Sequence, residues 1–539
     1  MYAILHPRPA QVPIGDAKEV DEVFDAISYC KGGAVIRMVH AVVGEAAFKT
    51  GLRSYMAAFK YGNATTDDLW AAWEASSGQP VKSLMGLWTK QMGFPLLELV
   101  SLEGAKPDGS VTLQLKQRWF VADGSAVAPS EAKTWSVPLF AQTSASGGAV
   151  SDMEIMTAAS HALKLPAAPP GGGGGGGGPV TWVKLNAGQH VPLRVKYPDS
   201  MMPALCAAVR QKRFSATDRI GLLSDHSALC RAGELDPVRY LELLAAYVDE
   251  DDATVLGMLL ERLLGLQSLF KNKPELASAY CAFAYSLVSP QIAKLGWDPK
   301  LADGHLTRKL RGEVVAALPA LCATDPAVVA EARRRYEAYV NDPDPAKAKS
   351  KADLPSEIAA PVLKIVQANG GATEFDALQS LFRSLELNDD KKQALLALGY
   401  APTDELRVKG LEFAVSGEVK TQDFFYLMLT MHRASASGTD ATWKHFTEHL
   451  PKYKKMLNSA SGSLTDAVIS GACSSFATKE KADEVQAFFD AHKADFDKNQ
   501  RKIQQTLEAI RTNAAYLERF TAGGALSWLQ AYKAPVPVA

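Results

Sequence analysis

Apolar residues recur at helical spacing along the first part of the chain. Between residues 20 and 93 they fall three or four positions apart, as in Val35, Val39 and Val43. This spacing predicts helices that each bury one apolar face. The proline of Gly93-Phe94-Pro95 cannot continue a helix, so we expect the helical segment to end there.

The next segment, residues 96–186, alternates between apolar and polar residues. Val111–Lys116 is the clearest case, and Trp135–Phe140 and Thr181–Leu185 are two further predicted strands. Alternation of this kind is typical of a strand with one buried face. Because turn-forming Gly, Pro, Asp and Ser lie between these runs, we expect a small antiparallel β domain.

Helical spacing returns at about residue 203 and continues to residue 530, with short polar breaks. The breaks come at irregular intervals, so the sequence has no strict repeat. Stacked antiparallel helix pairs are the simplest way to bury such faces. The predicted fold is therefore mainly α, with a small β domain followed by a large α-solenoid. Among its predicted helices are 218–230, 240–248, 253–269, 406–415, 482–492 and 503–512.

A run of eight glycines, Gly171–Gly178, follows Pro169-Pro170 inside the predicted β domain. Composition alone favours a flexible linker between domains. A phosphate-binding loop is disfavoured, because neither Gly-Lys-Ser/Thr nor a helix start follows the glycines.

Composition narrows the classes of partner. At ~150 residues per domain, the 539 residues imply about two to four domains. The 58 basic and 59 acidic residues give a net charge of −1, so neither nucleic acid nor a membrane surface is expected as a partner.

No apolar run approaches the ~20 residues of a bilayer span, and the amino terminus lacks a signal-peptide pattern. The six cysteines form no Cys-x-x-Cys pair, which favours a reducing, cytoplasmic compartment.

The histidines offer one candidate metal site. The zincin pattern His-Glu-x-x-His does not occur, but His445-Phe-Thr-Glu448-His449 matches the inverted pattern His-x-x-Glu-His. Two histidines one helical turn apart can hold zinc, with the glutamate as general base. A further acidic ligand would have to come from downstream, where Glu518 is a candidate by position alone. The preferred interpretation is a solvated helix face, because a flank of lysines such as Lys444 disfavours a dication.

Short motifs in a fixed order along nearly the whole chain carry a family resemblance. They are His6-Pro7, Glu19–Gly32, Asn63–Trp70, Trp88–Pro95, Trp182–Asn186, Asp218-Arg219 with Leu222 and Asp225, Leu295–Pro299, Leu310–Gly312, Glu331–Arg335, Trp443-Lys444, Val485–Phe489 and Asn513–Ala515. With these motifs the chain resembles the carboxy-terminal part of a zinc aminopeptidase of the gluzincin type. The puromycin-sensitive aminopeptidase branch is the nearest.

The resemblance implies three parts. Residues 1–93 would be the end of the helical lobe of a thermolysin-like catalytic domain, 94–187 a β-sandwich, and 188–539 a HEAT-like helical domain. The glycine run at 171–178 would then be an expanded loop within the sandwich, which replaces the linker interpretation.

The resemblance also assigns a role to Tyr29. In the family, the tyrosine of the Ser-Tyr-x-Lys-Gly motif faces the substrate carbonyl, and Ser28-Tyr-Cys-Lys-Gly32 matches that motif. When water attacks a peptide carbonyl, negative charge develops on the carbonyl oxygen. A phenol, with a reference pKa of ~10, is neutral at pH 7 and can donate a hydrogen bond to that oxygen. The resemblance therefore implies that Tyr29 is a catalytic residue that stabilises the transition state. Without the motif, a tyrosine at a helix start would be interpreted as a packing residue.

The other parts of the family's active site precede this tyrosine in the family, and none occurs in this sequence. They are the zinc-binding helix, the glutamate that completes the zinc site, and the strand that anchors the substrate's amine. The family's Gly-Phe-Tyr-Arg turn after the last sandwich strand is Val191-Pro-Leu-Arg194 here, with only the arginine retained. Zinc is therefore expected in the complete enzyme and not in this chain alone.

Two functions follow. The first is the carboxy-terminal part of a zinc-dependent aminopeptidase that removes amino-terminal residues from peptides and is inactive as an isolated chain. The alternative is a non-catalytic, HEAT-like protein derived from that family, which binds peptides or proteins. The first is favoured because the apolar inner faces of the helices in 20–93 would meet water if nothing covered them.

Overall fold

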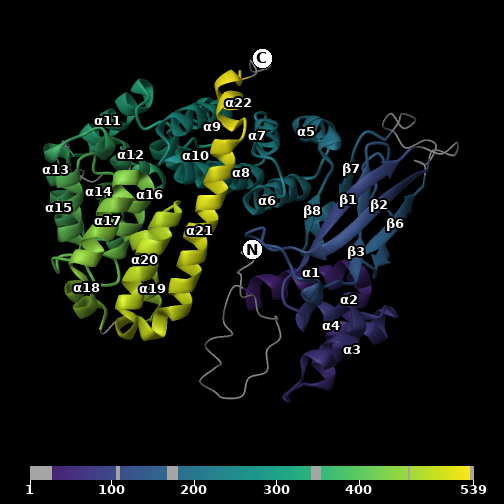
Figure 1. Ribbon diagram of the computed structural model, residues 1–539. Helices are drawn as coiled ribbons and strands as arrows, with labels where there is room; N and C mark the ends of the chain where they lie inside the picture. Colours follow the sequence, from purple (N-terminus) through teal and green to yellow (C-terminus); the bar gives the residue numbers. More distant parts are fainter. Residues whose placement is uncertain (1–26, 105–109, 167–179, 341–353, 459–461, 535–539) are drawn as a thin grey trace. The chain divides into compact units, whose positions relative to one another are not determined.

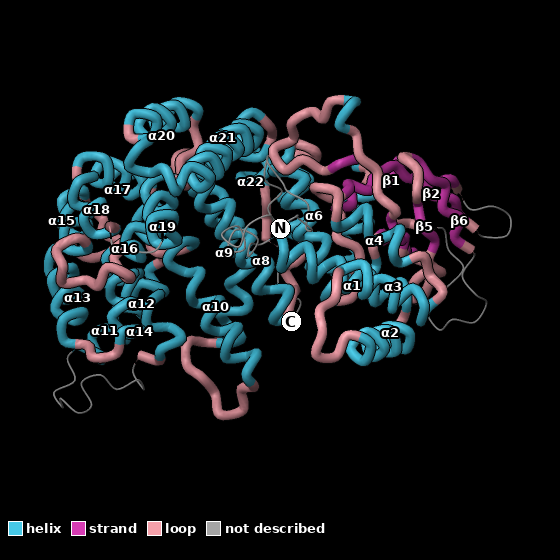
Figure 2. The backbone as a smooth tube through the Cα atoms, turned by 90° about the horizontal axis from the view of Figure 1, so that it is seen from below, coloured by secondary structure: helices cyan, strands magenta, loops and turns pink. Residues whose placement is uncertain are grey.

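The computed structural model describes residues 27–104, 110–166, 180–340, 354–458 and 462–534 (Figure 1). The chain packs into two compact units, residues 1–246 and residues 247–539. All strands among the described residues belong to the first unit, where Figure 2 shows them in magenta. The glycine run at 171–178 and the motif His6-Pro7 lie outside the described residues.

The first unit opens with helices, as the spacing of apolar residues predicts. Trp73 is buried between two of them, where its indole Nε1 donates to the backbone oxygen of Phe48 at 3.0 Å and its ring stacks on the Phe48 ring. Gly51 is needed for this contact, because a Cβ there would lie 2.5 Å from Trp73 Cδ1. The elements are the π-helical turn η2 (Ile27–Lys31), α1 (Gly32–Val43), α2 (Glu45–Ala58), α3 (Thr66–Ser77) and α4 (Val81–Thr89).

The β strands begin directly after this helical lobe, at Pro95. Four strands form a sheet in the order β6-β2-β1-β8, in which β8 runs parallel to β1 and the other neighbours are antiparallel. Two strand pairs, β3 with β5 and β4 with β7, complete the β structure. The bounds are β1 (Pro95–Glu103), β2 (Val111–Trp119), β3 (Val137–Leu139), β4 (Ala141–Thr143), β5 (Glu154–Met156), β6 (Ser160–Leu165), β7 (Val183–Leu185) and β8 (Arg194–Lys196).

The three predicted strands are confirmed as β2, β3 and β7, the last two shorter than expected. A buried glutamine joins two of these segments. Gln117 of β2 donates through Nε2 to the backbone oxygen of Trp135 at 2.8 Å and accepts from the Trp135 amide at 2.9 Å. This pair of bonds satisfies a buried side-chain amide and fixes the approach to β3.

The first unit ends in three helices that follow β8. Their bounds are α5 (Met202–Arg210), α6 (Ala216–Ala232) and α7 (Pro237–Ala245), and short 3-10 turns, η4 (Ala187–Gln189) and η5 (Asp199–Met201), precede them. A further 3-10 turn, η3 (Pro129–Glu131), lies before β3. Helix α6 packs against β8 and η4, so the last strand and its turn are held by the helix that follows.

The second unit is helical throughout its described residues. Pairs of consecutive helices pack together, such as α13 with α14 and α16 with α17. The predicted helices of this region are confirmed. Their bounds are α8 (Ala253–Phe270), α9 (Pro274–Leu295), α10 (His305–Leu321), α11 (Pro326–Val340), α12 (Ser356–Ala368), α13 (Ala372–Ser384), α14 (Asn388–Leu398), α15 (Asp404–Ala414), α16 (Phe425–Ala434), α17 (Ala436–Glu448), α18 (Leu450–Leu457), α19 (Gly462–Cys473), α20 (Lys479–Ala491), the 3-10 turn η6 (Lys493–Asn499), α21 (Gln500–Ala522) and α22 (Ala525–Ala531).

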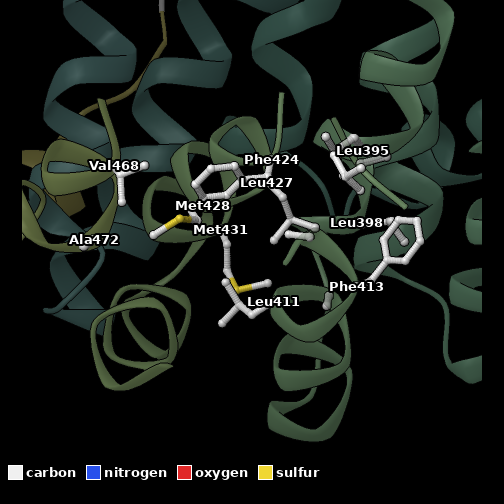
Figure 3. Packing of buried hydrophobic residues seen from close by; sticks show 14 of the residues in the cluster. Leu395, Leu398, Leu411, Phe413, Phe424, Leu427, Met428, Met431, Val468 and Ala472 are labelled. Carbon is white, nitrogen blue, oxygen red and sulfur yellow. The ribbon is translucent and has the colours of Figure 1, made fainter. Parts of the chain in front are cut away.

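One continuous hydrophobic cluster fills this unit from α10 to α21. Figure 3 shows part of it, where Leu411 of α15 lies close to Met431 of α16 and Val468 of α19 lies near Met428. Burial of such side chains stabilises a fold by roughly 1.5–3 kcal/mol each. The cluster therefore fixes α15, α16 and α19 relative to one another within the unit.

Helix α8 is, by length and composition, apolar enough to cross a membrane, with a mean hydropathy of 1.3 over its 18 residues. A second span among the described residues would need α10 and α11 to act together across a bend of 117°. Helix α8 packs against α9, α10 and α21, so its apolar face has partners inside the unit.

Candidate functional site

Tyr29 lies in the π-helical turn η2, which runs directly into α1. Its side chain is 66% exposed. Turns of this type are rare and frequently occur at functional sites. The turn therefore presents a phenol at the surface of the helical lobe.

Lys31 anchors this turn from its other side. The Lys31 side chain is buried, and its Nζ donates to the backbone oxygen of Gln91, which follows α4, at 2.8 Å. Burial, with a smaller contribution from the charge of Lys133, lowers the pKa of Lys31 to about 8. Because the backbone next to Tyr29 is anchored, the position of the phenol is largely set before a ligand binds. Such preorganisation suits a hydrogen-bond donor.

Arg37 and His40 lie on α1, eight and eleven residues after Tyr29. The Arg37 guanidinium donates to the backbone oxygen of Gly188 at 2.9 Å, and His40 Nε2 lies 2.5 Å from Glu45 Oε2. Arg37 thus joins α1 to the turn after β7.

That turn is held by a buried ion pair. Lys184 Nζ lies 3.3 Å from Asp218 Oδ1, and the same oxygen accepts from the Gly188 amide at 2.9 Å. Both charged side chains are at most 5% exposed. Burial lowers the pKa of Lys184. The matched motifs Trp182–Asn186 and Asp218-Arg219 therefore include the pair that joins β7 to the start of α6.

Arg194, the one residue of the family's turn that this chain retains, forms a second ion pair, with Asp225. Arg194 Nη1 lies 3.0 Å from Asp225 Oδ1 and donates to Ser224 Oγ at 2.8 Å, while Asp225 Oδ2 accepts from the Val195 amide at 3.3 Å. Burial raises the pKa of Asp225, and Arg194 opposes that rise. Arg194 thus joins β8 to α6 through its charge, as Lys184 does for β7.

The residues around Tyr29 do not fit the family's catalytic zinc. The 539 residues contain no His-Glu-x-x-His. Within the part of the chain that the structure describes, the one group of His, Cys, Asp and Glu side chains close enough to share a metal ion is Glu412 with His445 and His449. This group belongs to the second unit.

The structure corrects the sequence-based picture of His445. That side chain is 3% exposed, so the interpretation as a solvated face is wrong for His445. The Glu448 carboxylate does not join the two histidines; its Oε1 lies 3.9 Å from Lys444 Nζ. Glu518 lies 3.9 Å from Lys479. The carboxylate that both histidines face is that of Glu412, 33 residues before His445. No local sequence signal points to it, because the proximity arises only from the packing of α15 on α17.

Comparison with known families gives two matches along the chain. The model of the Peptidase family M1 domain matches residues 3–88, and the model of the ERAP1-like C-terminal domain matches residues 182–512. The second match alone covers more than half of the 539 residues.

Individual relatives give the same picture. Aminopeptidase M1-A of Oryza sativa subsp. japonica is 31% identical over 96% of this chain and 56% of that protein. Aminopeptidase M1 of Arabidopsis thaliana is 33% identical over 95% of this chain and 56% of that protein. Puromycin-sensitive aminopeptidase of Caenorhabditis elegans is 30% identical over 96% of this chain and 52% of that protein. The chain thus spans about half the length of the curated relatives it matches.

Proposed function

The chain belongs to the M1 peptidase family as a carboxy-terminal aminopeptidase portion, and we propose that it forms part of a zinc-dependent enzyme that removes amino-terminal residues from peptides. The supporting observation is similarity to aminopeptidases over 95–96% of the chain at 30–33% identity. The zinc site of the complete enzyme would come from the part of those relatives that this chain does not span. A cytoplasmic location is part of the same proposal.

Three functional parts are proposed within the chain. Residues 1–93 are the end of the catalytic domain, and 94–187 are a β-sandwich that we extend through β8 to Lys196, since β8 pairs with β1. The remaining residues to 539 are a HEAT-like array that encloses the bound peptide. The helix pairs of the second unit support the last assignment.

Tyr29 is proposed as the donor to the oxygen of the scissile carbonyl. Its exposure and the anchoring of its turn by Lys31 support this role. The phenol O–H would donate to the oxygen as negative charge grows on it, and would stabilise the transition state more than the ground state. Tyr29 neither generates the nucleophile nor holds the metal, so it acts only together with the part of the active site that carries zinc.

Exposed apolar side chains on the helical lobe support the proposal that another part of the enzyme covers this surface. Leu52 and Met56 of α2 are 39% and 63% exposed, Tyr61 is 98% exposed, and Leu87 of α4 is 37% exposed. Groups of apolar side chains at a surface commonly mark an interface. We propose that the remainder of the catalytic domain covers this surface in the complete enzyme.

One observation favours a second candidate. Because the 539 residues contain no His-Glu-x-x-His, the isolated chain is also suited to a non-catalytic role in binding peptides or proteins. In that case the helical surface of the second unit carries the function and Tyr29 has no catalytic part.

An activity assay distinguishes the two. The 539-residue chain alone should not hydrolyse aminoacyl-coumarin substrates. The protein encoded by the longest reading frame that continues upstream of Met1 should hydrolyse them, and a chelator should abolish that activity. If no upstream in-frame His-Glu-x-x-His exists and the isolated chain binds peptides in a titration, the second candidate replaces the first.

A further inference from the structure

Three side chains of the second unit, Glu412, His445 and His449, bring their ligand atoms within 4.8 Å of one another. Glu412 lies on α15, His445 lies in α17, and His449 follows the last residue of α17. We propose that this triad is a binding site for a divalent transition metal ion, Zn²⁺ first, separate from the family's catalytic zinc.

Two distances between the ligand atoms match those found around a bound zinc ion. Glu412 Oε1 lies 3.1 Å from His445 Nε2 and 3.4 Å from His449 Nε2. Zinc binds nitrogen and oxygen at about 2.0–2.1 Å in tetrahedral geometry, so two ligand atoms on one ion are ~3.3 Å apart. Two edges of the coordination polyhedron therefore exist already.

The contact of His449 with a backbone oxygen selects the tautomer of its neutral ring. Nδ1 of His449 lies 3.1 Å from the backbone oxygen of His445, a group that can only accept, so Nδ1 carries the hydrogen. In the neutral ring Nε2 is then a lone pair, and it faces the Glu412 carboxylate at 3.4 Å. Two acceptors at this distance repel each other unless a cation lies between them, which is either a metal ion or an additional proton on the ring.

The other ring nitrogen of His445, Nδ1, also has a hydrogen-bond partner. Its Nδ1 lies 2.9 Å from the buried hydroxyl of Tyr453 on α18, and its ring stacks on that of His449 with centroids 4.3 Å apart. Such outer partners fix the orientation of a ligand ring.

A nearby lysine opposes the ion and sets how tightly it binds. Lys452 Nζ lies 2.9 Å from Glu412 Oε2, and this bond lowers the pKa of Glu412. Lys452 thus keeps the carboxylate ionised but places a positive charge beside the site. Its side chain is 40% exposed and can turn away, so we expect a site that fills on titration and does not retain zinc during purification. This agrees with the expectation that the isolated chain carries no catalytic zinc.

The donor set selects the class of ion. Two imidazole nitrogens and one carboxylate oxygen suit Zn²⁺, Co²⁺ or Ni²⁺, whereas Mg²⁺ and Ca²⁺ prefer oxygen alone. The side chains of Glu412 and His449 are 42% and 40% exposed, so water can take the fourth position. The bound ion would join α15 to the junction of α17 and α18.

Calorimetric titration of the 539-residue chain with Zn²⁺ tests the proposal. We expect one equivalent of Zn²⁺ to bind, and Mg²⁺ to show no comparable binding. Glu412→Gln and His449→Ala should each weaken binding more than ~100-fold, since loss of even an outer partner costs about 10–100-fold. Both side chains are partly exposed, so the variants should fold, which circular dichroism without metal verifies.

Glu448→Gln is the matched control. Glu448 belongs to the sequence motif but faces Lys444, so its loss should leave the affinity within about twofold. Tyr453→Phe should weaken binding about 10–100-fold through His445. Lys452→Met should strengthen it, because it removes the opposing charge.

Three results would overturn the proposal. The first is no saturable binding of Zn²⁺ by the unaltered chain. The second is equal affinity in the unaltered chain, Glu412→Gln and His449→Ala, which would mean adventitious binding elsewhere. The third is loss of binding in Glu448→Gln with retention in Glu412→Gln, which would restore the inverted zincin pattern. Catalytic activity plays no part in these readouts, so the test is independent of the proposed aminopeptidase function.

Discussion

Two helices of the first unit start with the same arrangement of residues but in opposite surroundings. Before α3, Thr65 caps the helix and exchanges hydrogen bonds with Asp68, and before α6, Ser215 does the same with Asp218. Asp68 is only partly buried, at a helix start whose cap, Thr65, is exposed. Asp218 is buried. Its Oδ1 also forms an ion pair with Lys184 and accepts a hydrogen bond from the Gly188 amide.

The difference shows that a capping motif does not fix the energetic role of its carboxylate. At α3 the carboxylate exchanges hydrogen bonds with water for hydrogen bonds with Thr65, so it contributes only modestly to stability. At α6 it pairs with a buried lysine, so its loss would leave that lysine in the interior without its ion-pair partner. The same local pattern thus serves as a helix cap in one place and as the joint between β7 and α6 in the other.

The largest effect is expected for Asp218→Asn. The substitution keeps the size of the side chain but removes the ion-pair partner of the buried Lys184 ammonium and leaves only the more distant charge of Asp225, and breaking a buried pair typically costs about 3–5 kcal/mol. Urea unfolding should show this loss, and hydrogen exchange should accelerate first in β7 and at the start of α6.

Asp68→Asn is the matched control for that substitution. It makes the same chemical change at the exposed helix start, so it should shift the unfolding midpoint far less. Equal shifts for the two variants would mean that burial of Asp218 adds nothing to its contribution.

The second prediction concerns an exposed polar group, Tyr29, for which we propose a catalytic role. Tyr29→Phe in the zinc-containing, active form of the enzyme should lower kcat by about 10²–10³, the usual cost of removing one oxyanion donor. Because Tyr29 is 66% exposed, the free energy of unfolding should hardly change, in contrast to Asp218→Asn. KM should change little, since the contact is made mainly in the transition state.

Tyr61→Phe provides the control for this prediction. Tyr61 is 98% exposed in the same helical lobe and should leave kcat unchanged. If Tyr29→Phe also left kcat unchanged, the family role of Tyr29 would be excluded.

A partly buried lysine that donates to neutral groups extends the comparison to the second unit. Lys271 donates to the backbone oxygen of His432 and, at 2.8 Å, to Thr439 Oγ1, both neutral groups. Burial, helped by the charge of Arg433 and opposed by Asp440, lowers the pKa of Lys271 to about 7. In the unfolded chain a lysine keeps a pKa of about 10.4.

The sign of the pH dependence follows from these two values. Between pH 7 and about 10.4 the unfolded chain binds more protons than the folded one, so Lys271 makes stability rise with pH in this window. One proton contributes at most about 1.4 kcal/mol per pH unit. Unfolding midpoints at pH 7, 8 and 9 should therefore rise less steeply in Lys271→Met than in the unaltered chain. Lys455→Met, at an exposed position, should leave the slope unchanged.

The local elements of the fold could be predicted from the sequence, because their causes are local. Thr65 and Asp68 lie three residues apart, which is the spacing of a capping box, so the residues that start α3 are neighbours in the sequence. The strand at Val111 also follows from alternation alone, and the structure extends it to Trp119.

The contacts that build the candidate sites could not be predicted in this way. Lys271 and His432 are 161 residues apart in the chain, and Glu412 and His445 are 33 apart, so only tertiary packing brings each pair together. The flanking lysines suggested a solvated surface around His445. In the structure one of them, Lys452, binds Glu412 instead, and the ring of His445 turns inward.

The smallest predicted effect returns to the two helix starts. Thr65→Ala removes an exposed cap and should cost about 1 kcal/mol. Ser215→Ala removes the same type of cap but also takes a donor from the buried Asp218 carboxylate, an additional cost of about 1–3 kcal/mol. Urea unfolding of both variants measures the difference directly. A double variant with Asp218→Asn sharpens the test: the cost of Ser215→Ala should shrink towards that of Thr65→Ala once the buried charge is gone, and a cost that stayed unchanged would assign the whole effect to the backbone of α6.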